Sequence, residues 1–266
     1  MYQEQWAPTL PGAVLWTSST AAEAGAARVL PDGCMDLIWK DGVLLVAGPD
    51  RVAQLVHRTP GESYAGLRFA PGTAAAVLDI AADELLDRRV PLDQLWPART
   101  AHRLAEQVDE AADPGAALER IALQRLSSLD RLRSTADPAE RLRRGLLGAL
   151  GSGAGVAEAA RAVGLSDRQL HRRCLTDFGY GPKTLARVLR LQRALELARG
   201  GVPLAQVAAR AGFADQPHLA RDVRALAGVP LRQLLQEQGQ DQGGAGQPGS
   251  GANRSTAFPS GSWTTA

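Results

Sequence analysis

Three side chains that can each form two parallel hydrogen bonds lie in two stretches of similar sequence in this 266-residue chain. The stretch from Ala157 to Arg173 holds Arg172, and the stretch from Ala205 to Arg221 holds Gln216 and Arg221. A guanidinium can bind the O6 and N7 edge of guanine through two parallel hydrogen bonds, and a glutamine amide can bind the N6 and N7 edge of adenine in the same way. These three residues are therefore candidates for reading DNA bases.

The two stretches share a spacing that is typical of a helix-turn-helix. In each, an alanine lies four residues before a glycine, Ala160 before Gly164 and Ala208 before Gly212. A small residue lets the backbones of two steeply crossing helices approach, and glycine accepts the positive φ of the turn between them. One such pair is common in helical hairpins, but two copies 48 residues apart indicate a repeated unit.

The helix after each turn has a predicted start and a predicted inward face. Ser166 and Asp215 stand at the N-cap positions, where side-chain oxygens accept hydrogen bonds from free backbone N–H groups. Leu170 and Leu219 are the apolar residues that we expect to face inward. The residues that we expect at the DNA are Ser166, Arg168, His171, Arg172 and Arg173 of the first of these helices, and Gln216, Pro217, His218, Arg221 and Arg224 of the second.

The net charge of +2 at pH 7 hides an asymmetry between the two halves of the chain. Residues 1–138 hold 13 basic and 19 acidic residues, whereas residues 139–238 hold 16 basic and 8 acidic ones, a net charge of +8. A basic block that carries two helix-turn-helix patterns suits binding to the phosphate backbone of DNA. Arg173, Arg187 and Arg224 are assigned to phosphates, which position a protein without reading sequence. A solvated surface in an arginine-rich chain is the alternative, and it leaves the two patterns unexplained.

Composition limits the class of protein. With 45% hydrophobic and 22% charged residues, a chain of this length can form two ordinary soluble domains. It has no apolar run of about 18 residues and no secretion signal at its start, so we expect a cytoplasmic protein with no membrane span.

Two distant cysteines, Cys34 and Cys174, argue against a disulfide scaffold or a structural zinc site. No G-x-S-x-G elbow, Walker loop, H-E-x-x-H motif or dinucleotide fingerprint occurs, so we expect neither catalysis nor a cofactor.

The N-terminal half is predicted to form short strands followed by helices. Five apolar runs between residues 13 and 69 are separated by Pro-Asp-Gly, Asp-Gly, Gly-Pro-Asp and Pro-Gly turns, which predicts a small antiparallel, cupin-like barrel. Helical periodicity follows, and these helices are expected to cover the sheet. The predicted fold class is α+β, with a seven-helix, all-α domain at the C-terminal end. The expected N-terminal helices span residues 74–80, 83–89, 97–112 and 114–129.

Four segments are predicted along the chain. Residues 1–133 form a β-rich effector or dimerisation domain with helices over 73–129, and residues 134–138 form a linker. Residues 139–238 form the DNA-binding domain, and residues 239–266, rich in Gly, Ser and Gln, are a disordered tail. The helices expected in the DNA-binding domain span residues 139–150, 156–163, 167–178, 182–199, 204–211, 216–227 and 230–236.

Further residues accompany the two patterns: Ala160-x3-Gly-Leu-Ser, Leu170-x-Arg172, Gly179-x-Gly-Pro182, Arg190-x3-Ala194, Val207-Ala208-x3-Gly212-Phe213, Asp215, Arg221 and Gly228-x-Pro230. In this combination, about 100 residues resemble the DNA-binding domain of the AraC/XylS family of bacterial transcription regulators. The resemblance implies a seven-helix domain whose third and sixth helices enter adjacent major-groove segments on one face of DNA.

The chain departs from this family at four positions where aromatic residues are common, Cys174, Leu185, Leu219 and Val223. The residues present are smaller but still apolar, which implies a repacked core rather than a lost function. Cys174 is accordingly expected to be a small core residue and not a thiol sensor.

The segment L-P-D-G-C-M-D-L-I-W, residues 30–39, resembles an uncharacterised β-rich, sensor-like domain that precedes some AraC-type domains. That resemblance implies an effector or protein-interaction role and names no ligand. Asp32, Cys34, Asp36 and His57 could be combined as metal ligands, but a cupin metal site usually has a His-x-His cluster, which this half of the sequence lacks. We therefore expect no metal.

The sequence thus predicts a sequence-specific transcription regulator of the AraC type. The expected partners are double-stranded promoter DNA, with a small-molecule effector at the N-terminal domain and RNA polymerase as candidates, and the protein is a monomer or a homodimer. The alternatives are a helical protein-interaction module that has lost DNA binding, and a DNA-repair-type fusion enzyme. Replacing Arg172 and Arg221 together separates them, because only a regulator then loses operator binding while keeping its fold.

Overall fold

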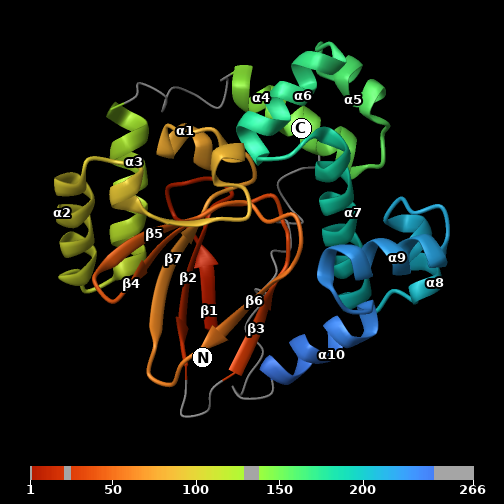
Figure 1. Cartoon of the computed structure of the whole chain (residues 1–266). Helices are drawn as coiled ribbons and strands as arrows, with labels where there is room; N and C mark the ends of the chain where they lie inside the picture. Colours follow the sequence, from red (N-terminus) through yellow and green to blue (C-terminus); the bar gives the residue numbers. More distant parts are fainter. Residues whose placement is uncertain (1, 21–24, 129–137, 243–266) are drawn as a thin grey trace.

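The computed structural model describes residues 2–20, 25–128 and 138–242 of the chain. Its architecture is α+β, with an N-terminal antiparallel sheet between two helices on one side and the C-terminal helices on the other (Figure 1). This arrangement confirms the fold class predicted from the sequence. The predicted linker, apart from Pro138, lies outside the described residues.

Six strands form one antiparallel sheet in the spatial order β1-β2-β7-β4-β5-β8, and two form a ribbon, β3-β6. The strands are β1 (Tyr2–Trp6), β2 (Val14–Ser19), β3 (Gly25–Val29), β4 (Asp36–Lys40), β5 (Val43–Ala47), β6 (Gln54–Arg58), β7 (Ser63–Arg68) and β8 (Arg89–Pro91). The predicted hairpin at Asp41 and Gly42 joins β4 to β5, and both residues have the positive φ that a tight two-residue turn requires. Among the described strands no pairing joins the two sheets, so an open sheet beside a ribbon takes the place of a closed barrel.

Three strands and one helix differ from the prediction. β1 is mostly polar, β3 consists largely of small residues and β8 has only three residues, so none has the apolar run that marks a strand. The helix predicted over residues 83–89 is instead a short 3-10 turn, η1 (Ala82–Leu85), followed by β8. Asp87 adopts a positive φ of 57° between them, a conformation that cannot continue a right-handed helix.

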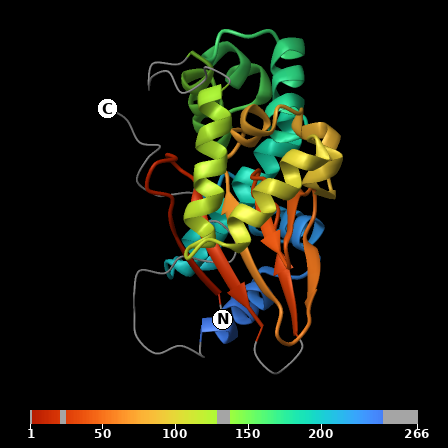
Figure 2. The ribbon, with the colours of Figure 1, turned by 90° about the vertical axis from the view of Figure 1, so that its left-hand side faces the viewer.

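Two helices cover one face of the six-stranded sheet, as predicted. α3 (Pro114–Ser128) packs on β2 and β7, α2 (Ala98–Asp109) packs on β5, and α1 (Ala74–Leu78) contacts α3. Figure 2 views the molecule from this side, with the two longer helices in front of the strands. A short 3-10 turn, η2 (Leu92–Gln94), leads into α2. The buried core between the layers includes Leu15, Val46, Leu67, Phe69, Leu104, Leu118 and Ile121.

The seven helices predicted for the C-terminal domain are all present. They are α4 (Pro138–Gly151), α5 (Val156–Ala162), α6 (Asp167–Phe178), α7 (Pro182–Arg199), α8 (Leu204–Arg210), α9 (Gln216–Ala227) and α10 (Leu231–Gln242). α10 extends beyond its predicted end at residue 236, so the first residues of the predicted tail, 239–242, are helical. Residues 243–266 lie outside the described part of the chain.

α7 contributes to two separate cores of this domain. Leu185 and Val188 from its first half pack with the side chains of α4, α5 and α6. Leu191 and Leu195 from its second half pack with those of α8, α9 and α10. The domain is therefore two small helical units that share one central helix.

A buried carboxylate fastens the start of the chain to α3. Glu119 Oε1 accepts hydrogen bonds from the backbone N–H of Thr9 at 2.7 Å, from the Thr9 hydroxyl at 2.5 Å and from the N–H of Leu10 at 3.1 Å. Through these three bonds Glu119 joins the loop between β1 and β2 to α3.

We predict that Glu119→Ala lowers the free energy of unfolding by about 2–3 kcal/mol, because the three donors of Thr9 and Leu10 lose their shared carboxylate acceptor. Glu119→Gln retains an acceptor oxygen and should cost less. Urea denaturation followed by tryptophan fluorescence measures both, since four of the five tryptophans lie in the N-terminal half. Equal stability of Glu119→Ala and the unmodified chain would contradict this role.

Candidate nucleic-acid interface

The turn between α5 and α6 has a defined hydrogen-bond pattern. Gly164, with a φ of 70°, donates from its N–H to the Arg161 carbonyl at 3.1 Å, and Leu165 donates to the Ala160 carbonyl at 2.9 Å. These two bonds form a Schellman motif, which ends a helix at a glycine in the left-handed conformation. Ala160 is almost fully buried where α5 meets its neighbours, as the spacing predicts.

The turn between α8 and α9 repeats this pattern. Gly212, with a φ of 79°, donates to the Ala209 carbonyl at 3.2 Å, and Phe213 donates to the Ala208 carbonyl at 2.9 Å. Ala208 is buried like its counterpart in the first unit. The two sequence patterns therefore form two turns with the same backbone conformation and the same hydrogen bonds.

The repeat extends one helix further back than the sequence analysis recognised. α4 ends with Gly153 and Ala154 bonded back to Leu150 and Ala149, and α7 ends with Gly201 and Val202 bonded back to Ala198 and Leu197. Gly153 and Gly201 both have positive φ and are also 48 residues apart. The repeated unit is therefore three helices long, and this glycine spacing is the signal that could have revealed it.

Both predicted N-caps are present. The backbone N–H of Gln169 donates to Ser166 Oγ at 3.3 Å, and Gln169 Oε1 accepts from the Ser166 N–H at 2.9 Å, which completes a capping box. Asp215 Oδ1 accepts from the N–H of His218 at 2.6 Å. The sequence analysis missed Gln169, although a glutamine three residues after a serine cap is a known signal for this motif.

The predicted DNA-facing side chains of α6 divide into two groups. Arg168, His171 and Arg172 are exposed on the N-terminal part of the helix, and within the described residues the two arginines make no side-chain hydrogen bond or ion pair. Arg173 is half-buried, and its Nε lies 2.6 Å from Asp177 Oδ2 one turn later. Arg168 and Arg172 are thus free to contact DNA, whereas Arg173 is engaged within its own helix.

The side chains of α9 divide similarly. Gln216, Pro217, Arg221 and Arg224 are exposed, and the three polar ones have no side-chain partner within the described part of the chain. His218 is partly buried: its ring lies edge-on to Phe213 with 5.3 Å between centroids, and its Nδ1 accepts from the Ala214 N–H at 3.3 Å. These contacts order the start of α9.

An acidic residue that the sequence analysis missed fastens α9 to α7. Asp222 accepts from Arg187 Nη2 at 3.1 Å and from Arg190 Nη2 at 3.4 Å, and both arginines lie on α7. Arg190 also stacks over the Phe213 ring, 5.4 Å from its centroid. Arg187, which the sequence analysis assigned to phosphate, is therefore engaged with Asp222.

α7 determines the separation of the two recognition helices. Figure 1 shows α6 and α9 beside its two ends, and both helices pack against it. With 18 residues, α7 is about 27 Å long at 1.5 Å per residue. AraC/XylS-type domains commonly have aromatic residues at the positions of Cys174, Leu185, Leu219 and Val223. In this chain all four side chains are fully or almost fully buried.

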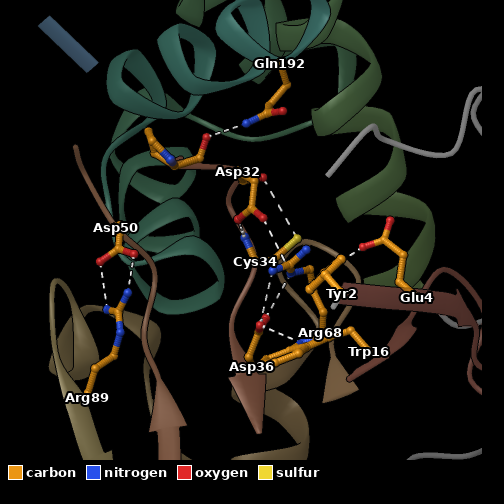
Figure 3. Close-up of polar contacts among 11 residues, drawn as sticks. Tyr2, Glu4, Trp16, Asp32, Cys34, Asp36, Asp50, Arg68, Arg89 and Gln192 are labelled. Carbon is orange, nitrogen blue, oxygen red and sulfur yellow. Dashed lines mark hydrogen bonds and ion pairs between the residues drawn. The ribbon is translucent and has the colours of Figure 1, made fainter. Parts of the chain in front are cut away.

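The four residues that were considered and rejected as a metal site, Asp32, Cys34, Asp36 and His57, do not come together. Asp32, Cys34 and Asp36 surround the buried guanidinium of Arg68, whose Nε lies 3.1 Å from Asp36 Oδ1 and 3.7 Å from Asp32 Oδ2 (Figure 3). His57 is exposed on the ribbon. Within the described residues no group of potential metal ligands is found.

Comparisons with known proteins match two separate parts of the chain. Residues 159–237 match the family "Helix-turn-helix domain", of the AraC type, and residues 13–91 match "Domain of unknown function (DUF6597)". A comparison with curated proteins gives no significant match. In the part of the chain that the structure describes, no helix is long and apolar enough to cross a membrane.

Solved structures of ToxT from Vibrio cholerae are similar to this chain. An apo lysine-to-alanine variant has 12% identity and a TM-score of 0.44, and covers 84% of this chain and 97% of its own. A complex of wild-type ToxT with an unsaturated fatty acid has 10% identity and a TM-score of 0.43, and covers 88% of this chain and 94% of its own.

We predict that Gly164→Ala destabilises the protein by about 1–2 kcal/mol, because an L-residue is strained in the left-handed conformation. No atom lies within 4 Å of the added Cβ, so the cost reflects backbone strain alone. Gly148→Ala is the matched control: it lies exposed inside α4 with equal space and should stabilise by about 0.5–1 kcal/mol. Thermal denaturation followed by circular dichroism measures both changes, and a stabilising Gly164→Ala would contradict the turn geometry.

The two cysteines are predicted to be unreactive in the folded protein. Burial raises the pKa of the Cys34 thiol well above its usual value, and burial with help from Asp177 raises the pKa of the Cys174 thiol to about 12. Because the thiolate is the nucleophile, iodoacetamide near neutral pH should modify neither residue until the chain unfolds. Mass spectrometry with and without urea tests this, and rapid labelling of folded Cys174 would contradict a core role.

Proposed function

We infer that this chain, which carries an AraC-type helix-turn-helix domain over residues 159–237, is a sequence-specific DNA-binding transcription regulator. Its recognition helices α6 and α9 enter adjacent major-groove segments on one face of the double helix. The N-terminal domain modulates this binding.

One observation carries the proposal: two helices with the same turn, the same kind of cap and the same exposed chemistry lie at opposite ends of α7. α6 presents Arg168 and Arg172 from its N-terminal part, and α9 presents Gln216 and Arg221 from the corresponding part. The N-terminal part of a recognition helix is the part that reads base edges in helix-turn-helix proteins. Arg172, Arg221 and Gln216 remain the candidates for base contacts.

Spacing and charge support the same function. Two successive major-groove segments on one face of DNA are about 34 Å apart. α6 and α9 lie beside the two ends of α7, which is about 27 Å long, so their separation is comparable. Residues 139–238 carry a net charge of +8, which favours binding to phosphates. Arg224 and Lys183 are exposed and suit phosphate binding. Arg173 and Arg187, which were also predicted to contact phosphates, would have to leave Asp177 and Asp222 to do so.

The contact between the two domains supports modulation. α6 packs against η1 and α1 of the N-terminal domain, and Leu30 of that domain belongs to the core around α9. A small molecule or a protein that changed the N-terminal domain would therefore act on elements in contact with both recognition helices. We propose an effector of this kind, with RNA polymerase as a further candidate partner.

We predict that Arg172→Ala combined with Arg221→Ala lowers the affinity for a selected DNA site at least about thirtyfold, since each bidentate arginine–guanine pair contributes about 1–3 kcal/mol. The site is first selected from random DNA with the full chain, and binding is then measured by fluorescence anisotropy. Affinity should also fall steeply as salt rises, because bound phosphates release their counterions.

The matched control is Arg193→Ala, which removes one exposed arginine of α7 outside the recognition helices and should retain sequence preference. Circular dichroism checks that every variant is folded. A folded double variant that binds the selected DNA as the unmodified chain does would contradict base reading by Arg172 and Arg221, and failure of the full chain to select any DNA sequence would argue against a regulator and for the protein-interaction module.

A further inference from the structure

The C-terminal ends of both recognition helices rest on the N-terminal domain. α6 ends at Gly179, whose backbone is so close to the N-terminal domain that a Cβ there would stand 2.5 Å from Pro49 Cγ. At the end of α9, the N–H of Ala53 donates to the Leu226 carbonyl at 2.7 Å. Because both contacts lie at the far ends of the helices, their DNA-facing parts stay exposed.

A second contact to α9 comes from Arg28 on β3. Its Nη1 donates to the Ala227 carbonyl at 3.0 Å, and its Nε lies 3.2 Å from Glu237 Oε2 on α10. The last carbonyls of a helix have no partner within the helix and carry the negative end of its dipole. A guanidinium at this place satisfies one such carbonyl, so Arg28 caps α9 from the other domain.

The two residues that follow β3 continue this contact. Leu30 is buried in the second helical core with Leu191, Leu195 and Leu226. The carbonyl of Pro31 accepts a hydrogen bond from Gln192 Nε2 at 2.7 Å, at the midpoint of α7 (Figure 3). Residues 28–31 therefore touch both the end of α9 and the helix that connects α9 to α6.

Two ion pairs, one buried and one partly buried, hold the loops next to these contacts. Arg68 binds Asp36 and lies near Asp32, directly below the loop that carries Leu30, and Figure 3 shows this group facing Gln192 across the domain boundary. Arg89 binds Asp50 through two hydrogen bonds of 2.8 and 2.5 Å, and this fixes the loop that leads to Ala53. The loops that carry Leu30 and Ala53 are thus held by ion pairs within the N-terminal domain.

We propose that Arg28 is a positioning residue for DNA binding, which holds the second recognition helix in a fixed register relative to the first. This inference rests on the proposed function of α6 and α9. Arg28 acts through the end of α9, away from the exposed start of that helix, so its loss loosens this end within the limits set by the shared core and Asp222 while α6 keeps its place. The result is weaker binding to the half-site that α9 reads, and a weaker dependence on the spacing between the half-sites.

The test compares the full chain with Arg28→Ala, Arg28→Lys and a control, Lys40→Ala, which removes an ion pair with Glu62 on the sheet, outside the domain contacts described above. Each binds the selected two-part site, a version with the second half scrambled, and versions with one base pair inserted or removed between the halves. Hydrogen exchange of the free proteins measures the protection of the α9 and α10 amides relative to those of α6.

Arg28→Ala should bind the two-part site about tenfold more weakly, which corresponds to about 1.4 kcal/mol, and should bind the scrambled site unchanged. It should tolerate altered spacing better than the unmodified chain and should lose protection in α9 and α10 only. Arg28→Lys should recover part of the loss, and Lys40→Ala should behave as the unmodified chain does.

Equal weakening on the two-part and scrambled sites, or an unchanged spacing dependence, would overturn the positioning role. Unchanged protection of α9 would overturn the cap itself. If the unmodified chain shows no sequence preference while Arg28→Ala still loses protection in α9, the proposed function fails and the cap stands.

Discussion

The proposed DNA-reading surface depends on a helix that belongs to two hydrophobic cores at once. The first half of α7 packs beneath α6 and its second half beneath α9, so neither recognition helix can turn without disturbing a core that α7 helps to form. Arg187 and Arg190 reach from α7 to Asp222 and fix the rotation of α9. Protein interiors packed like organic crystals resist such deformation. The angle between the two recognition helices is thus a property of packing and not of a flexible connection.

The N-terminal domain adds a second support, in which two buried aspartates pair with arginines, one of them buried and the other partly exposed. Arg68 with Asp36, and Arg89 with Asp50, lie below the loops that meet the C-terminal domain. Burial raises the pKa of both aspartates, against the effect of their arginine partners. Desolvation largely offsets the attraction in such pairs, so they contribute little net stability. Their directional hydrogen bonds determine loop conformation, and through the loops they determine where the helix ends rest.

The features that the sequence predicted are those determined by local chemistry. The glycines at 164 and 212, and the caps at Ser166 and Asp215, follow from the conformational preferences of single residues, so their spacing was sufficient to locate both turns. β3 and β8 were missed because partners distant in sequence stabilise them, and β1 was missed because its residues are mostly polar. The roles of Asp222 and Arg28 were missed for the same reason: their partners lie on other helices or in another domain.

The shared helix α7 also limits how such a protein could change its DNA site. Adding one residue to α7 would rotate one helical unit against the other by about 100° and separate them by about 1.5 Å. One additional base pair rotates DNA by only about 36° and lengthens it by about 3.4 Å. One added residue matches no such step, and four added residues, which bring the rotation back to about 40°, lengthen the helix by about 6 Å. Divergence in this lineage should therefore change base-reading side chains while the length of α7 stays constant.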